Sequence, residues 1–495
     1  MSERITIEEL ESYLWNSAVL LRSSIDAGAY KQYIFPLLFF KRICDVYDEE
    51  TTQAIEEYGE DIVDFDEDEL HTFIVPEGHH WKDVREVSEN VGIAIVNAFH
   101  AIEKANIELL HGVFGDAAWT NKNRLPDSLL KDLIEHFSSK TLSIANCPED
   151  ELGQGYEYLI KKFADDSGHT AQEFYTNRTV VHLMTEILKP QSGESVYDPT
   201  CGSAGMLISC IAYLKEHGQE WRNLKAYGQE INQLTSAIGR MNLFLHGVQT
   251  FDIINDDTLT KPGFIEEGKL KTFDIVLANP PYSIKQWDRT AFEHDMYGRN
   301  FLGVPPQGRA DYAFIQHILT SMAPHTGRCA ILLPHGILSR EDEKKMRENL
   351  IKADLVDCVI GLGKHLFYNS AMEACILICR MQKDAKRKGK IQLIDARKYV
   401  TRENDERFLT DQQLKAISDL YNRYEDVDKE SAIITIEQAA EQDYSLMITK
   451  YISGTFSDEA DEDYDFEGSM TSWLCDSYNN HKETGLLSKM IGGAN

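Results

Sequence analysis

The chain has 495 residues, of which 42% are hydrophobic and 10% aromatic; this is enough for a large core and excludes wholesale disorder. At about 100–200 residues per domain, the length predicts two to four domains. Its 50 Lys and Arg against 81 Asp and Glu give a formal net charge of -31, which excludes nucleic-acid binding through the overall field, because phosphate would be repelled. If the protein acts on DNA, the basic contacts must be local or supplied by a partner.

Residues 1–165 are predicted to form a helical N-terminal domain. Apolar residues recur every three or four positions in ITIEELESYLWNSAVLLRSSI, AYKQYIFPLLFFKRICDVYDEE, VGIAIVNAFHAIEKAN, LPDSLLKDLIEHFSSK and DELGQGYEYLIKKFADDSG. The N-terminus, MSERITIEELESYLW, has neither the basic start nor the apolar segment of a signal peptide, and the longest apolar runs are too short to span a bilayer. We therefore expect a cytoplasmic protein that does not contact a membrane.

Residues 166–400 are predicted to form an α/β domain. The strand-like segments are ESVYDP, NLKAYGQE, TFDIIND, FDIVLANP, GRCAILLP, LVDCVIGL, EACILICRM and KIQLIDA. The helical segments between them are AGMLISCIAYLKEH, QLTSAIGRMNLFLH, DYAFIQHILTSMA and EDEKKMRENLIKA. This alternation specifies a mostly parallel, doubly wound, Rossmann-like sheet with helices on both faces. The last three strands follow one another without helices, which predicts an antiparallel hairpin at one edge.

Residues 401–495 are predicted to form a helical C-terminal region with subunit contacts. TDQQLKAISDLYNRY has the helical pattern, and SDEADEDYDFEG begins an acidic tail. The nine cysteines of the whole chain are scattered without a CxxC pair, which favours buried thiols over disulfides or a metal site. We expect no metal.

A glycine-containing turn follows the first predicted strand, in SVYDPTCGSAGML. Gly202 and Gly205 allow a tight turn into the next helix, and Asp198 lies at the strand's carboxyl end, where open α/β sheets bind ligands. Glu230 ends the next strand, where a carboxylate can accept both hydroxyls of a ribose. Asp257, after the third strand, can accept from an adenine amino group. No GxGxxG or GxxxxGK[ST] sequence occurs, so a nucleotide-driven motor has no support.

The most specific motif is DIVLANPPYS, in which Asn279, Pro280, Pro281 and Tyr282 follow an apolar strand. The two prolines end the strand and hold the backbone rigid. The Asn279 side-chain oxygen and the Pro280 carbonyl can then both accept from one exocyclic NH2 group. This draws the nitrogen lone pair out of ring conjugation and directs it at an electrophile, while Tyr282 offers a flat face on which a base can stack.

The order of FYTNR, DPTCGSAG, YGQE, NDDTL and NPPY resembles that of the S-adenosylmethionine-dependent amino-methyltransferases of DNA. The resemblance is strongest to the modification (HsdM-type) subunit of type I restriction-modification systems. It covers nearly the whole chain, because DELGQGYEYLI, ADYAFIQHIL, RCAILLPHGILSR and HLFYNSAMEACILI also recur in that family's order.

The resemblance implies S-adenosylmethionine as the cofactor. The residues implied to bind it are Gln172, Glu173, Phe174, Tyr175, Thr176, Asn177, Asp198, Gly202, Ser203, Ala204, Gly205, Glu230 and Asp257. The residues implied to hold the target base, flipped out of the duplex, are Asn279, Pro280, Pro281 and Tyr282. The sequence departs from the family at two of these places: Asn177 stands where proline is common, and Ala204 where a third glycine is common.

The implied function is adenine N6-methylation of DNA, because the related cytosine enzymes usually carry Ser at the place of Asn279. The implied partners are DNA and a separate specificity subunit with two copies of this chain, and a restriction subunit is left open. Two alternatives also stay open: a DNA amino-methyltransferase that works alone or in another defence system, and a catalytically silent assembly subunit. Only about 95 residues follow the predicted catalytic domain, too few and too acidic for a target-recognition domain, which favours recognition by another chain.

Overall fold

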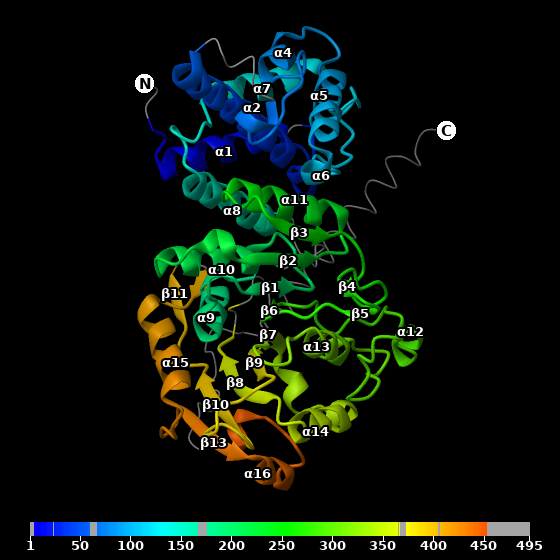
Figure 1. Ribbon diagram of the computed structural model, residues 1–495, viewed down its shortest axis with the longest axis vertical. Coiled ribbons are helices and arrows are strands. Elements are labelled where there is room, and N and C mark those ends of the chain that lie inside the picture. Colours follow the sequence, from blue (N-terminus) through cyan, green and yellow to red (C-terminus); the bar gives the residue numbers. More distant parts are fainter. Residues whose placement is uncertain are drawn as a thin grey trace, which may run out of the picture. The chain divides into compact units, whose positions relative to one another are not determined.

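The computed structural model describes residues 4–22, 24–59, 67–166, 176–364, 366, 373–403 and 406–452 (Figure 1). The predicted cofactor residues Gln172, Glu173, Phe174 and Tyr175, and the acidic tail that begins at Ser457, lie outside the described residues. In the part of the chain that is described, no helix has the length and apolar composition to cross a membrane.

The N-terminal region is helical, as predicted. Its helices are α1 (Ile7–Leu21), α2 (Lys31–Tyr58), α3 (Glu67–Leu70), α4 (Trp81–Glu86), α5 (Val91–Ala105), α6 (Ile107–Leu110), α7 (Asp127–Ser138) and α8 (Glu149–Asp166). Thr6 and Glu9 form a capping box that begins α1. The core of this region is rich in aromatic side chains: the ring of Phe40 on α2 lies 5.3 Å from Trp81 and 5.6 Å from Phe99, measured between centroids.

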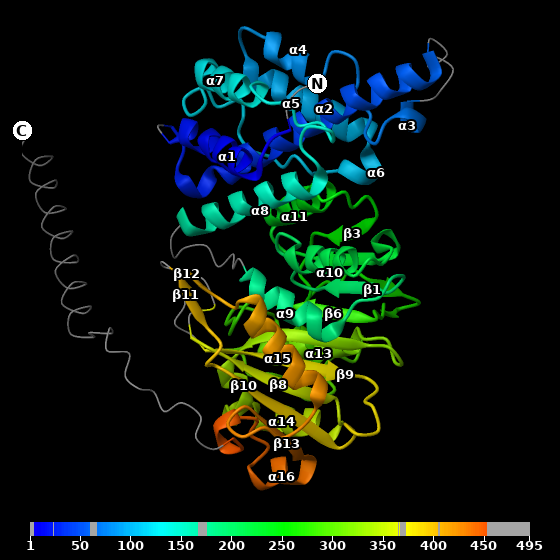
Figure 2. The ribbon, with the colours of Figure 1, turned by 90° about the vertical axis from the view of Figure 1, so that its left-hand side faces the viewer.

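Helix α8 joins the helical region to the α/β region, and two glycines let it pack closely on both sides (Figure 2). A Cβ atom at Gly155 would lie 2.9 Å from the side chains of Leu10 and Leu14 on α1. A Cβ at Gly153 would lie 2.5 Å from the ring of His246, just after helix α11 (Gln233–Leu245). The GQG of DELGQGYEYLI therefore has a packing role.

The α/β region is built on one nine-stranded sheet, in the order β13-β10-β8-β9-β7-β6-β1-β2-β3. The strands are β1 (Ser195–Asp198), β2 (Lys225–Gln229), β3 (Phe251–Ile254), β6 (Ile275–Ala278), β7 (Arg328–Pro334), β8 (Val356–Leu362), β9 (Ala374–Arg380), β10 (Lys390–Ala396) and β13 (Ser431–Thr435). Two small hairpins lie apart from it: β4 (Ile265–Glu266) with β5 (Lys269–Leu270), and β11 (Thr401–Glu403) with β12 (Glu406–Phe408). The sheet is parallel except for β9 and β13.

Helices cover both faces of this sheet, which confirms the predicted doubly wound architecture. One face packs against α9 (Arg178–Leu188), α10 (Gly205–Glu216) and α15 (Asp411–Arg423). The other packs against α13 (Asp311–Thr320), α14 (Lys344–Lys352) and α16 (Ile436–Glu441). A short helix, α12 (Arg289–Glu293), lies in the long connection between β6 and α13. Because both faces are covered, β7 and β8 are buried along their whole lengths and read as continuous apolar runs.

Two features of the sheet differ from the prediction. The antiparallel strand β9 is not at an edge: it lies between β7 and β8 and pairs with both, because the α14 crossover leaves room for one strand between them. The antiparallel strand that does lie at an edge is β13, in the segment after residue 400 for which only helix was predicted. Its sequence, SAIIT, is too short for alternation to stand out beside the long helical pattern of α15.

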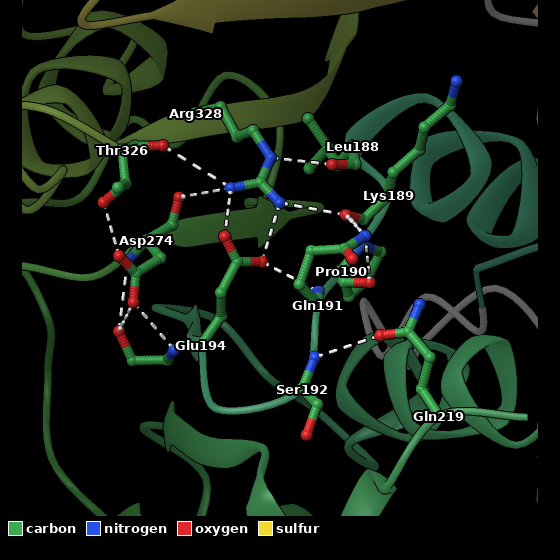
Figure 3. A network of polar contacts seen from close by, with 11 residues as sticks. Leu188, Lys189, Pro190, Gln191, Ser192, Glu194, Gln219, Asp274, Thr326 and Arg328 are labelled. Carbon is green, nitrogen blue, oxygen red and sulfur yellow. Dashed lines mark hydrogen bonds and ion pairs between the residues drawn. The ribbon is translucent and has the colours of Figure 1, made fainter. Parts of the chain in front are cut away.

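The edge of the sheet that carries the N-terminal ends of β1, β6 and β7 is fixed by a polar network around Arg328 (Figure 3). The guanidinium donates two bonds to the carboxylate of Glu194, at 2.9 and 2.8 Å. It also donates to the carbonyls of Leu188 at 2.7 Å and Lys189 at 3.0 Å, at the C-terminal end of α9. The network thereby holds the C-terminal end of α9 against the sheet. The N-terminal end of α9 lies on the side where the parallel strands have their carboxyl ends.

Candidate functional site

The predicted site residues gather at the carboxyl edge of the parallel strands. Asp198 ends β1, Glu230 follows β2, Asp257 follows β3 and Asn279 follows β6. They line two adjoining cavities of about 450 and 550 Å³. The cavities share Ile160, Thr200, Gly202, Ser203 and Asn279 as lining residues. The four side chains that the sequence singled out at strand ends therefore lie around one region of the structure.

The turn between β1 and α10 forms the floor of both cavities. Gly202 and Ala204 have left-handed backbones, with φ of 52° and 64°. A Cβ added at Gly202 or Gly205 would meet no other protein atom within 4 Å. The backbone therefore leaves open space above the N-terminus of α10, where a polar or anionic group can approach.

Glu230 supports this turn while it lines the larger cavity. Its carboxylate accepts the backbone N–H of Gly202 at 3.0 Å and that of Asn232 at 2.8 Å. Its carbonyl accepts from the side chain of Asn255 at 2.8 Å. These contacts fix the acid at the end of β2, facing the cavity.

Asp257 shapes the far wall of the larger cavity. Its carboxylate accepts from the backbone of Leu259 at 2.9 Å and from the hydroxyl of Thr260 at 2.8 Å. Leu259 and Phe314 of α13 line the same cavity. A carboxylate at the rim of an apolar slot suits a flat ring that carries an amino group.

Asp198 is buried, with 2% of its surface exposed, and accepts the backbone N–H of Thr200 at 3.0 Å. Burial, and to a lesser degree the negative charge of Glu230, raise the pKa of Asp198 to about 7. The carboxyl lines the smaller cavity. A cation in that cavity would stabilise the charged form.

The residues of the Asn-Pro-Pro-Tyr motif connect this pocket to α9. The Asn279 side-chain nitrogen donates to the hydroxyl of Thr176 at 2.9 Å, and its oxygen accepts from the hydroxyl of Tyr282 at 2.9 Å. Burial raises the pKa of Tyr282 well above its usual value, so this hydroxyl stays protonated and donates. Pro280 is buried, and Pro281 lines the larger cavity.

The two positions that depart from the family pattern have local structural roles. The Asn177 side chain caps α9 by accepting from the backbone of Thr179 at 3.0 Å, and it donates to the carbonyl of Arg407 at 2.8 Å. Ala204 is fully buried in the core. Neither residue lines the described cavities, so the structure does not bring these two side chains to the ligand space.

Most other residues that line the cavities were not singled out from the sequence; Thr200, Arg178 and Phe314 are among them. Phe314 lies in DYAFIQHIL, whose apolar pattern predicts a helix but does not show that the side chain faces a cavity. Arg178 follows Asn177 directly and forms an ion pair with Glu157 of α8. No group of His, Cys, Asp and Glu suitable for a metal occurs among the described residues.

Comparisons with known proteins identify the family of this chain. Residues 148–460 match the N-6 DNA methylase family, and residues 10–137 match the HsdM N-terminal domain. The methylase subunit of the type I restriction enzyme HindI from Haemophilus influenzae is 31% identical over 78% of this chain and 91% of its own length. The methylase subunit of MjaIX from Methanocaldococcus jannaschii is 28% identical over 91% of this chain and 85% of its own.

Among solved structures, the methyltransferase subunit of a type I restriction-modification system from Streptococcus thermophilus superposes with a TM-score of 0.79. It is 29% identical, and the match covers 90% of this chain and all of that one. A modification subunit of a putative type I restriction enzyme from Vibrio vulnificus, 17% identical with a TM-score of 0.66 over 88% of this chain and 94% of that one, shows the same fold.

Proposed function

The chain belongs to the N-6 DNA methylases, as the methylase subunit of a type I restriction-modification system, and on that premise we propose which of its residues bind the cofactor and hold the target adenine. The observation that carries the proposal is the meeting of three strand-end acids, an open glycine turn and Asn279 around two adjoining cavities.

S-adenosylmethionine occupies the joined cavities in this proposal. Thr176, Asp198 and the turn from Gly202 to Gly205 bind its amino-acid end, Glu230 its ribose and Asp257 its adenine. The open space above the glycines and the buried Asp198 fit a ligand with a polar, cationic end. When bound, the cofactor supplies an activated methyl group on its sulfonium sulfur. Gln172, Glu173, Phe174 and Tyr175, together with Asn177 and Ala204, remain assigned to this site by family resemblance.

The Asn279 oxygen and the Pro280 carbonyl accept the amino hydrogens of the flipped adenine, and Tyr282 stacks on its ring. Tyr282 donates to the Asn279 oxygen, so the amino group of the base meets an acceptor that is already oriented. The Thr176 hydroxyl accepts from the side-chain nitrogen of Asn279. This bond orients the Asn279 amide so that its oxygen, and not its nitrogen, points at the base. Pro281 makes the backbone rigid between these groups.

Glu230→Ala tests the cofactor assignment. We expect it to weaken binding of S-adenosylmethionine by about 1–3 kcal/mol, the scale of lost hydrogen bonds to a charged group. Isothermal titration of the purified chain measures this. Asp252→Ala, which removes an exposed carboxylate on the neighbouring strand β3, is the matched control and should bind as the wild type does. Equal affinity in Glu230→Ala and wild type rejects the assignment.

The raised pKa of Asp198 predicts a pH dependence of cofactor binding. A cationic ligand beside Asp198 lowers the pKa of that carboxyl below 7. Below about pH 7, ligand binding is therefore coupled to the release of a proton from Asp198. Affinity should therefore rise up to about tenfold between roughly pH 6 and pH 7.5, and then level off. Asp198→Asn should remove most of this slope. A wild-type affinity that is constant or falls over this range contradicts the role of Asp198.

The partners follow from the same premise. We propose that a separate specificity subunit reads the DNA sequence and holds two copies of this chain, with contacts from the C-terminal region, residues 401–495. Because α15 and β13 complete the catalytic sheet, the catalytic domain of this proposal, which begins near residue 166, extends past residue 400 to Thr435.

A further inference from the structure

The backbone immediately after the Asn-Pro-Pro-Tyr motif is held in an unfavourable conformation. Ser283 has a φ of 51°, in the left-handed region that residues with a side chain rarely adopt. Such a conformation persists only where the surroundings hold it. At Ser283 the holding group is a side chain from a distant part of the chain.

That side chain is Asp311, the first residue of α13. One carboxylate oxygen accepts the backbone N–H of Ser283 at 2.8 Å, and the other lies 3.4 Å from its hydroxyl. Asp311 is 1% exposed, so neither bond competes with water. The same helix carries Phe314, which lines the larger cavity one turn further on.

Asp311 is itself fixed by Arg340. The guanidinium donates to the second carboxylate oxygen of Asp311 at 2.7 Å and lies 3.4 Å from the carboxylate of Glu343. Glu343 is fully buried, and burial raises its pKa to about 7. The carboxylate of Asp311 is therefore pinned between a backbone N–H and an arginine.

We propose that Asp311 is a positioning residue for methyl transfer: by holding Ser283 in its left-handed conformation, it fixes the end of the turn that places Asn279, Pro280 and Tyr282. This rests on the role proposed above for the motif and adds that its geometry is set from α13. Asp311 touches neither cofactor nor base; its effect passes through the Ser283 backbone to Tyr282 and from there to the Asn279 oxygen.

The test uses the complex of this chain with its specificity subunit and DNA that carries the recognition site. Single-turnover methylation is measured per cofactor-binding site, beside the dissociation constant for S-adenosylmethionine. Asp311→Ala should lower the rate constant about 10- to 100-fold, as expected for misplaced reacting groups, and leave the dissociation constant within about twofold. Asp311→Asn keeps an acceptor for Ser283 and should recover part of the loss.

A second change separates positioning from general stability. Glycine adopts the left-handed conformation without strain, so in a Ser283→Gly background Asp311→Ala should cost about threefold or less. Asp357→Asn is the matched control: this carboxylate is also fully buried and bonded to an arginine, Arg387, at 3.0 Å, but lies on β8 away from the cavities. It should lower the melting temperature without changing the rate per site.

The proposal is overturned if Asp311→Ala costs the same factor in the wild-type background and in the Ser283→Gly background, or if its whole effect is a loss of cofactor-binding sites. Either result is distinguishable from failure of the motif's proposed role, because that failure would appear as full activity in a variant of Asn279 itself. If Asp311→Ala does not fold, the comparison of Asp311→Asn in the two backgrounds gives the same decision.

Discussion

Asn279→Ala is expected to lower the rate constant of methyl transfer about 10²- to 10³-fold in the assembled complex. The substitution removes one of the two acceptors that draw the lone pair of the adenine amino group toward the methyl donor. This interaction strengthens as the nitrogen attacks, so its loss should appear in the chemical step and not in ground-state binding. Single-turnover methylation and cofactor titration of the same preparation measure the two quantities.

The dissociation constant for S-adenosylmethionine should stay within about twofold in this variant, because the other groups that line the cavities are unchanged. Asn422→Ala is a suitable control, since Asn422 belongs to α15 and bonds within its own helix and to Lys189. It should methylate at the wild-type rate. An Asn279→Ala enzyme with full activity would remove the catalytic role assigned to the motif.

The isolated chain should bind S-adenosylmethionine yet methylate DNA at least about 10³-fold more slowly than the complex with its specificity subunit. Its net charge of -31 opposes the phosphate contacts on which DNA affinity rests. In the described part of the chain, residues up to 166 form the helical region and those from 176 onward form the sheet with its covering helices and hairpins. No further folded unit of the described chain is left to read base edges.

Methylation rates of the chain alone and of the complex, on DNA with and without the recognition site, check this expectation at several salt concentrations. The complex should show the steep salt dependence of a protein that replaces counterions on phosphate. Efficient, site-selective methylation by the chain alone at physiological salt would show that it recognises DNA by itself.

The sequence predicted most of the fold because its signals are local. Amphipathic periodicity identified α1, α2 and α15, and the buried apolar runs identified β7 and β8. The position of β9 depends instead on which strand fills the space between β7 and β8, a property of the assembled sheet. The edge strand β13 was missed because five residues carry little periodic signal.

The candidate site likewise has one part that local sequence signals predict and another part that depends on the folded chain. Asp198, Glu230, Asp257 and Asn279 could be placed together because each lies at, or within three residues after, the carboxyl end of a recognisable strand, and parallel strands bring these ends to one side of the sheet. Two contacts between residues far apart in the sequence could not be predicted from local patterns. The Asn177 side chain, besides its local cap on α9, donates to the carbonyl of Arg407, which lies 230 positions away in the sequence.

The contact of Asp311 with Ser283 likewise joins residues 28 positions apart. Its ion pair with Arg340 spans another 29 positions. Neither spacing follows from helix or strand periodicity, because the β6–α13 connection and the strand β7 lie between these residues. The contacts that hold the backbone after the Asn-Pro-Pro-Tyr motif therefore depend on the folded chain and could not be read from the sequence.

The identity of the methylated nucleoside tests the proposed reaction most directly. DNA carrying the recognition site is incubated with the assembled complex and S-adenosylmethionine labelled in its methyl group, digested to nucleosides and analysed by mass spectrometry. The expected result is label in N6-methyladenine, which disappears in Asn279→Ala. Label in N4-methylcytosine, or DNA that stays unlabelled although the complex binds both cofactor and DNA, would contradict it.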